Sequence, residues 1–214
     1  MPVPNPTPIF RFLHIDNLTV VLQRGGLHAP NHTPNDGLAY KTIHDVSVQQ
    51  KRANEPVACD PKGVIHDYVP FYFGCLSPML LKLKTGQVVG YNAGQEPLIY
   101  LATTAQAVAQ SGVGFVFSDG HGLAAFTSWF DDLSQLYKVD WNMVYQQYWA
   151  DNINDMDRQR RKQAELLIHR VCPWNLIEEI GVINTPMQSK VQQILNQYPA
   201  QLHRPVSVRS NWYY

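Results

Sequence analysis

Short apolar runs and apolar residues spaced three or four apart divide the chain into strands and helices. Strands are expected at residues 9–14, 97–102, 114–118, 166–168, 182–183 and 205–214. Helices are expected at residues 17–24, 104–111, 141–148, 173–180 and 187–198. Because both types of element alternate irregularly along the chain, the pattern predicts the α+β class.

Polar and glycine residues mark the ends of several of these elements. Thr103 and Gln106 have the spacing of a capping box before the second predicted helix. Gly181 is expected to end the helix at 173–180. The segment 29–36, APNHTPND, has the composition of a loop, and a loop of this length is often functional.

Length and composition describe an ordinary globular protein. The chain has 214 residues, of which 45% are hydrophobic and 16% charged, and no repeat or linker divides it. We therefore expect one domain spanning residues 1–214. No apolar stretch is long enough to cross a bilayer, and the N-terminus lacks the pattern of a signal peptide, so a cytoplasmic protein is expected. Three widely spaced cysteines predict neither a disulfide framework nor a metal site.

The charges limit the kinds of partner. Lys and Arg together number 17, as do Asp and Glu, so the net charge is zero with neutral histidines. Any contact with DNA must then come from a local basic patch, and its affinity must weaken with salt. Tyrosine and tryptophan are plentiful, which leaves stacking on unpaired bases open.

The most distinctive stretch is DRQRRKQAELLIHR, residues 157–170, in which a basic segment meets an apolar run at Glu165. Arginines bind phosphates, and a carboxylate stabilises developing positive charge. The stretch therefore fits a site that holds an anionic ligand and stabilises a cationic transition state. A solvated helical face is the alternative, because charge runs usually face solvent and Arg161 lies four residues before Glu165.

Other candidate residues stand at element ends. His14 ends the first predicted strand beside a helix N-terminus, and His121 lies in the turn after the strand at 114–118. Both positions favour ligand recognition, although a histidine at a strand end is more often structural. Arg52 precedes a break at Pro56 and matters for function only if it faces the same cleft as Glu165. The aromatic segment 66–84 fits either a core strand or the wall of a cleft for a planar ligand.

Motifs that are absent exclude several classes of enzyme. The chain has no G-x-G-x-x-G, no G-x-x-x-x-G-K-[ST], no H-E-x-x-H and no G-x-S-x-G. A Rossmann dehydrogenase, a P-loop NTPase, a zincin and an α/β-hydrolase are therefore not supported.

Four stretches in order resemble the DarT family, the toxin half of the DarTG toxin–antitoxin system. They are FRFLHIDNLTVVLQRGGL at 10–27, HDYVPFYFGCLSPML at 66–80, SDGH at 118–121 and RRKQAELLIH at 160–169. The resemblance extends to the terminal WYY. The chain departs from the expected family pattern at Cys75 and Leu76, where a proline-arginine pair is expected.

The resemblance implies a mono-ADP-ribosyltransferase fold, a split β-sandwich with flanking helices around an NAD+ cleft. It implies cleavage of the nicotinamide N-glycosidic bond and transfer of ADP-ribose to a thymine of single-stranded DNA within a short sequence context. The modification would block replication, in growth control or defence against phage. A macrodomain antitoxin would reverse it, and the enzyme would be a monomer without metal.

The resemblance also assigns roles to residues. Glu165 matches the catalytic glutamate and would stabilise an oxocarbenium-like ribosyl cation. Arg52 matches the second catalytic residue, which would bind the NAD+ phosphates, orient Glu165 or help to deprotonate the thymine. The implied NAD+ contacts are His14, Asn17, Gly26, Leu27, Arg52, Phe71 and Tyr72. The implied DNA contacts are Met79 and His121 near a flipped thymine, with Arg158 and Arg160 on flanking phosphates.

Two further functions stay open from the sequence. The first is an ADP-ribosyltransferase that acts on another base or on protein. The second is a catalytically silent module that binds NAD+ or DNA with the same fold. The presence of both Glu165 and Arg52 favours an active enzyme over the silent module.

Overall fold

A computed structural model describes all residues from 1 to 214, and its centre is a large sheet of eight strands. The strands are β1 (Pro8–His14), β2 (Gly26–His28), β3 (Tyr68–Tyr72), β4 (Leu98–Thr104), β5 (Phe115–Ser118), β6 (Trp129–Phe130), β7 (Glu165–His169), β8 (Val171–Pro173), β9 (Glu179–Val182) and β10 (Val206–Val208). Their order in the large sheet is β10-β9-β4-β1-β3-β7-β5-β6, and β2 pairs with β8 in a separate small sheet.

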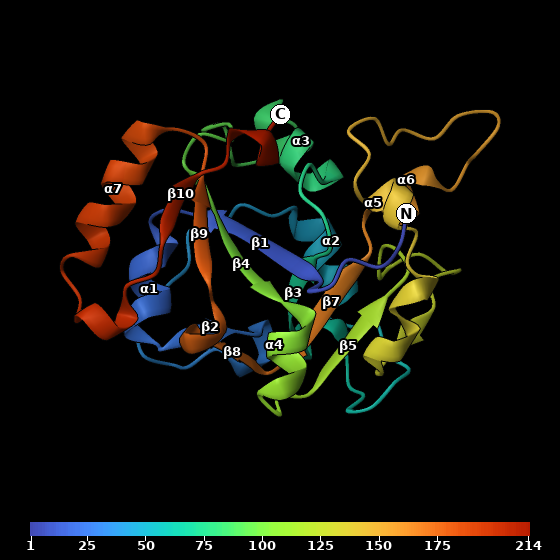
Figure 1. The fold of residues 1–214 in the computed structure, drawn as a ribbon, viewed down its shortest axis with the longest axis horizontal. Coiled ribbons are helices and arrows are strands. Elements are labelled where there is room, and N and C mark those ends of the chain that lie inside the picture. Colours follow the sequence, from blue (N-terminus) through green and yellow to red (C-terminus); the bar gives the residue numbers. More distant parts are fainter.

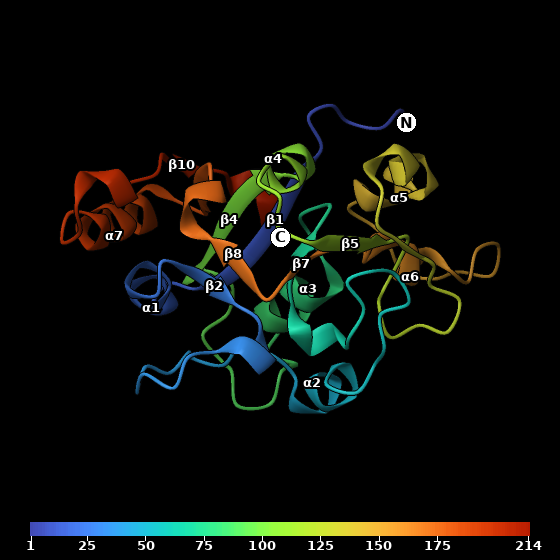
Figure 2. The ribbon, with the colours of Figure 1, turned by 90° about the horizontal axis from the view of Figure 1, so that it is seen from below.

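Seven α-helices and several 3₁₀ turns connect the strands. The helices are α1 (Asn17–Gln23), α2 (Val46–Arg52), α3 (Pro78–Lys84), α4 (Ala105–Gln110), α5 (Trp141–Val144), α6 (Arg158–Lys162) and α7 (Thr185–Leu195). Helix α7 flanks β9 and β10 at one end of the molecule, and α5 and α6 gather near β5 at the other (Figure 1). Helices α2 and α4 lie on opposite sides of β1 and β4 (Figure 2).

The large sheet is split between β1 and β3. Strand β1 pairs with β4 along its whole length, but it pairs with β3 only at Phe10 and Tyr72. Beyond this point the guanidinium of Arg11 donates a hydrogen bond of 2.9 Å to the carbonyl of Pro70 in place of a backbone ladder. The expected α+β class is therefore confirmed, and the separation of β1 from β3 opens the space in which the candidate site lies.

Alternation along β1 distributes its side chains between two cores. Ile9 and Leu13 belong to the largest cluster of buried apolar residues, whereas Phe10 and Phe12 belong to a second cluster. This follows from the geometry of a strand, because successive side chains point to opposite faces. The split sheet is thus covered on both faces and held in place next to the site.

Several expectations about single elements were wrong. The helix expected at 173–180 is a 3₁₀ turn at Trp174–Leu176 followed by β9. Gly181 does not end a helix: it lies inside β9, where a Cβ atom would overlap the indole ring of Trp212. A glycine that makes room for a packed ring therefore has the same sequence signal as a helix end.

Two other helical expectations also changed. The helix expected at 141–148 ends at Val144, as α5, and Tyr148 beyond it is 80% exposed. The cap of α4 is Thr104 and not Thr103. The Thr104 hydroxyl accepts a hydrogen bond from the Ala107 N–H.

None of the helices combines the length and apolar content needed to cross a bilayer. The three cysteines are free thiols.

Candidate active site

A cavity of about 770 Å³ opens where β1 and β3 separate. Its walls come from β1, β3, α2, the start of β7 and the segment between β2 and α2. This volume lies within the usual range for small-molecule and cofactor sites. The cavity is therefore the candidate active site.

Arg52 and Glu165 form a buried ion pair in this cavity. Arg52 is the last residue of α2 and Glu165 the first of β7, and they are 7% and 2% exposed. Arg52 Nη1 lies 3.1 Å from Glu165 Oε1, and Nη2 lies 3.0 Å from Oε2. Two parallel hydrogen bonds fix the orientation of the carboxylate.

A backbone amide completes the environment of the carboxylate. The N–H of Gly122, in the turn after β5, donates a hydrogen bond of 3.2 Å to Glu165 Oε1. A Cβ atom at Gly122 would lie 2.7 Å from the same oxygen, so any larger residue would displace the carboxylate. Glu165 therefore receives three donors from two separate segments.

Burial and charge alter the acid–base chemistry of the neighbours of Glu165. Burial acts to lower the pKa of Arg52, but the charge and hydrogen bonds of Glu165 outweigh it and raise that pKa above its ordinary value. Burial, together with the charge of Glu165, raises the pKa of Tyr72 to about 12. Arg52 therefore stays a cation, and Tyr72 stays protonated and can donate from its hydroxyl.

Asn17 and His14, both expected to contact NAD+ near the N-terminus of the first helix, differ in whether they line the cavity. Asn17 lines the cavity and holds the segment before α2: its Nδ2 donates to the Lys41 carbonyl at 2.9 Å, and its Oδ1 accepts from the Lys41 N–H at 2.7 Å. His14 is buried and does not line the cavity. Burial lowers the pKa of His14, so its neutral ring accepts at Nδ1 from the Asp16 N–H and carries its proton on Nε2.

The other expected NAD+ contacts divide into lining and supporting residues. Leu27, Phe71 and Tyr72 line the cavity, but Gly26 does not. Gly26 is instead required by the β2–β8 pairing, because a Cβ atom there would overlap the Cys172 carbonyl. The roles of these residues in NAD+ binding remain predictions.

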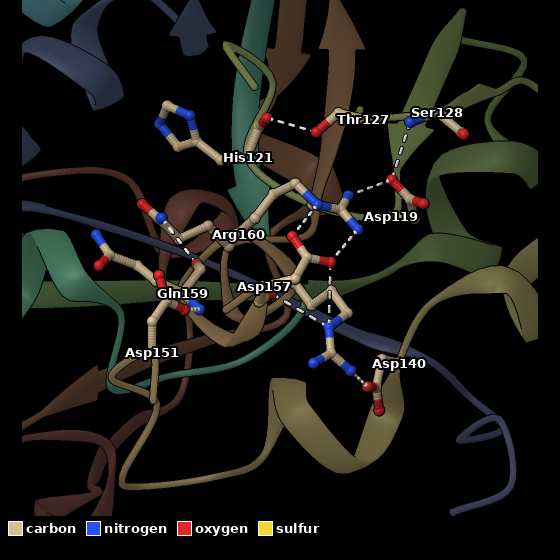
Figure 3. A network of polar contacts seen from close by, with 12 residues as sticks. Asp119, His121, Thr127, Ser128, Asp140, Asp151, Asp157, Gln159 and Arg160 are labelled. Atoms are coloured by element: carbon tan, nitrogen blue, oxygen red, sulfur yellow. Dashed lines mark hydrogen bonds and ion pairs between the residues drawn. The ribbon is translucent and has the colours of Figure 1, made fainter. Parts of the chain in front are cut away.

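Two of the residues expected to contact DNA have side chains at the wall of the cavity. Met79 and His121 line it, and the imidazole of His121 points away from the ion pairs of Arg160 (Figure 3). Nδ1 of His121 accepts from the Leu123 N–H at 3.3 Å, and burial lowers the pKa of the ring. His121 therefore presents a neutral Nε2–H donor.

The two arginines expected on DNA phosphates are engaged inside the protein. Arg160 lines the cavity, but its guanidinium pairs with Asp119 and Asp157. Arg158 does not line the cavity, and its guanidinium donates to the carbonyls of Tyr148 and Ala150. Their contacts with DNA remain predictions.

The cavity also holds polar groups that sequence reasoning missed. Arg11 Nε and the Tyr40 hydroxyl are buried without a hydrogen-bond partner, and Arg11 forms no ion pair with a carboxylate. Buried donors are normally satisfied, so a guanidinium at a cavity wall with a free Nε and no carboxylate partner fits an anionic ligand. Alternation predicts an apolar residue at position 11, which is the only sequence signal that marks Arg11.

The chain matches known proteins over its full length. Residues 10–214 match the family model described as "ssDNA thymidine ADP-ribosyltransferase, DarT". A DNA ADP-ribosyl transferase of Thermus sp. (strain 2.9) is 40% identical over 211 residues, covering 99% of this chain and 98% of that protein. One of Escherichia coli O127:H6 is 31% identical over 211 residues, covering 99% of this chain and 95% of that protein.

Solved structures of one relative have the same fold. Thermus sp. 2.9 DarT in complex with ADP-ribosylated ssDNA superposes with a TM-score of 0.93 at 39% identity, covering 100% of this chain and 99% of the other. The same protein in complex with NAD+ gives a TM-score of 0.89, covering 100% of both chains. The chain therefore belongs to the DarT family of single-stranded-DNA thymidine ADP-ribosyltransferases.

Proposed function

We propose that this protein transfers ADP-ribose from NAD+ to a thymine base of single-stranded DNA, and that Glu165 and Arg52 are its catalytic residues. The observation that carries the proposal is the buried, bidentate Arg52–Glu165 pair in a cavity of a chain that belongs to the DarT family. The relative from Thermus sp. 2.9, solved with NAD+ and with ADP-ribosylated DNA, supports both substrates.

The cavity fits NAD+ in size and charge. Its volume of about 770 Å³ accommodates a dinucleotide, and the unpaired guanidinium of Arg11 suits a diphosphate. Leu27, Phe71 and Tyr72 supply apolar and aromatic wall for the planar ends. NAD+ supplies the ADP-ribosyl group: the bond between nicotinamide and the ribose breaks, a bond between the ribose and the thymine forms, and the proton displaced from the thymine passes to water.

Glu165 provides the negative charge that the reaction requires. Positive charge develops on the ribose as nicotinamide leaves, and a preorganised carboxylate in a site shielded from water stabilises it strongly. The donors from Arg52 and Gly122 hold this carboxylate in one orientation before the substrate binds. The carboxylate therefore needs little reorganisation during the reaction.

Arg52 acts as the partner that orients Glu165. Three roles were open from the family resemblance, and the geometry favours this one because both Nη atoms donate to the carboxylate. Proton removal from thymine by Arg52 is disfavoured, since the ion pair raises its pKa. On the DNA side, the neutral Nε2–H of His121 can donate to a base carbonyl, and Met79 packs against the base face.

The same assignment extends to the setting of the reaction. A DNA substrate implies a cytoplasmic site of action. We further propose that residues 1–214 act as one domain and as a monomer, and that a macrodomain antitoxin removes the modification. The eight-stranded sheet, whose strands come from the whole length of the chain, supports the single domain.

The test is transfer to short oligonucleotides. The protein is incubated with NAD+ and a single-stranded oligonucleotide containing thymine, and the DNA is examined by mass spectrometry. We expect a gain of one ADP-ribose that is absent from a thymine-free oligonucleotide and from the duplex. Transfer to the thymine-free strand would indicate that the enzyme modifies another base. Transfer to protein would indicate a protein acceptor. A complete lack of NAD+ turnover would indicate a catalytically silent module.

A further inference from the structure

Two glycines in the turn after β5 each lie against a charged side chain from the segment α6–β7. A Cβ atom at Gly120 would overlap Arg160 Nη1 and lie 2.9 Å from Arg160 Cγ, and one at Gly122 would lie 2.7 Å from Glu165 Oε1. Neither glycine has a positive φ, so the backbone itself does not require glycine. The space taken by Arg160 and Glu165 is therefore the physical reason for both glycines.

The guanidinium of Arg160 joins the turn to the start of α6 (Figure 3). Its Nε and Nη2 donate to the two oxygens of Asp157 at 2.7 and 2.8 Å, and its Nη1 donates to Asp119 Oδ1 at 2.9 Å. The same Asp119 oxygen accepts from the Ser128 N–H at 2.9 Å, which closes the loop between β5 and β6. Two of these hydrogen bonds hold the guanidinium against Asp157, and the third fixes Asp119 relative to α6.

Main-chain contacts continue this attachment toward Glu165. The His121 N–H donates to the Arg160 carbonyl at 3.0 Å, and Ser118 Oγ donates to the Gly120 carbonyl at 2.7 Å. The next amide along the turn is the Gly122 N–H that donates to Glu165 Oε1. Arg160 therefore contacts the turn through its side chain and its backbone, immediately before the amide that contacts the carboxylate.

We propose that Arg160 is a positioning residue, which holds the turn 119–122 against α6 so that the Gly122 amide faces Glu165. This inference rests on the proposed function, because it concerns the geometry of Glu165. A side chain in this role affects the rate of the chemical step and not the binding of either substrate. A phosphate contact, by contrast, affects DNA binding and its salt dependence.

Steady-state kinetics of transfer to a thymine-containing oligonucleotide separate these roles. For Arg160→Met and for Asp119→Asn, we expect kcat to fall by about 10- to 100-fold while KM for NAD+ and for the oligonucleotide stays unchanged. The double variant should lose no more than the worse single variant, because both substitutions break one contact. The matched control is Arg209→Met, which removes a bidentate pair with Glu179 at the far end of the sheet and should leave both parameters unchanged.

A third variant, Gly120→Ala, leaves every charged residue in place. Gly120→Ala places a methyl group where the guanidinium lies, and should lower kcat as Arg160→Met does, with thermal unfolding of each variant as the check of the fold. A raised KM for the oligonucleotide with unchanged kcat and a weaker salt dependence would overturn the inference in favour of a phosphate contact. Unchanged kinetics in all variants would also overturn it, whereas wild-type protein that modifies no DNA would refute the proposed function itself.

Discussion

Arg52 and Glu165 lie 113 positions apart in the chain, yet their side chains meet in two parallel hydrogen bonds of 3.1 and 3.0 Å. Each is nearly inaccessible to solvent, so neither charge has bulk water to replace its partner. Breaking a buried pair of this kind by removing one partner typically costs about 3–5 kcal/mol of folding free energy. The pair therefore links the catalytic geometry to the stability of the fold.

The first prediction tests the fork geometry of Arg52. Arg52→Lys keeps the positive charge next to Glu165, but one ammonium group cannot reproduce two parallel bonds. We expect kcat for transfer to fall by about 100-fold, with a thermal midpoint much closer to wild type than that of Arg52→Ala. Equal activity of the lysine variant and the wild type would show that charge alone is sufficient.

The second prediction concerns the backbone amide at Gly122. Gly122→Ala retains the N–H donor but places a methyl group 2.7 Å from Glu165 Oε1, so the carboxylate must move. We expect a loss of about 100-fold in kcat, the scale of a displacement of about 1 Å. Gly114→Ala is the matched control, because its Cβ atom would meet only ordinary contacts, the nearest at 3.4 Å. Similar activity of the two variants would contradict the role of Gly122.

The third prediction concerns the unpaired guanidinium of Arg11. Arg11→Met should raise KM for NAD+ by about 10-fold, since one charge-assisted hydrogen bond to a phosphate is lost. The same change removes both the unpartnered Nε and the Nη1 hydrogen bond to the Pro70 carbonyl, so the thermal midpoint of the free protein should change little. A large fall in thermal midpoint would show that Arg11 serves the fold and not the ligand.

The fourth prediction is that mild acid lowers the free energy of unfolding, at pH values above those at which the carboxylates titrate. Burial lowers the pKa of five histidines below the ordinary value of 6.5, namely His14, His44, His66, His121 and His169. The unfolded chain therefore binds more protons than the folded one as the pH falls through 6.5, so the free energy of unfolding decreases with falling pH. The pKa values of paired aspartates such as Asp157 lie below 3.8, outside this window.

Urea unfolding at pH 7.5 and at pH 5.5 measures this effect directly. We expect a lower midpoint at pH 5.5 than at pH 7.5, where both states hold most of these rings neutral. A midpoint that is unchanged or higher at pH 5.5 would mean that the histidines gain partners in the folded state that favour their charged form.

Local patterns predicted most of the sheet. The runs before His14 and after Glu165 have the length and apolar content of buried strands, and both are strands in the structure. Helix α2 was not expected, because its cap at Asp45 and its short polar sequence carry little apolar periodicity. Gly181 was misread, since its reason lies in the ring of Trp212, which is 31 residues away in the chain.

The site was less predictable than the fold because its key contacts are long-range. The i,i+4 alternative for Arg161 and Glu165 was wrong: Arg161 pairs with Asp140, Asp155 and Asp157. No local pattern reveals that Arg52 is the true partner of Glu165, and only the family resemblance brought the two together. The turn glycines and Arg11 depend on the space and contacts around them, which a single sequence does not record.

The most direct test of the central claim is the comparison of wild type with Glu165→Gln, which keeps the shape of the side chain and removes its charge. Each protein is incubated with NAD+ and a thymine-containing single strand, and the DNA mass is recorded alongside NAD+ binding by calorimetry. We predict one added ADP-ribose with the wild type, a rate at least about 100-fold lower with the variant, and NAD+ binding by both. Equal modification of the DNA by the two proteins would contradict the assignment of Glu165 as the catalytic carboxylate.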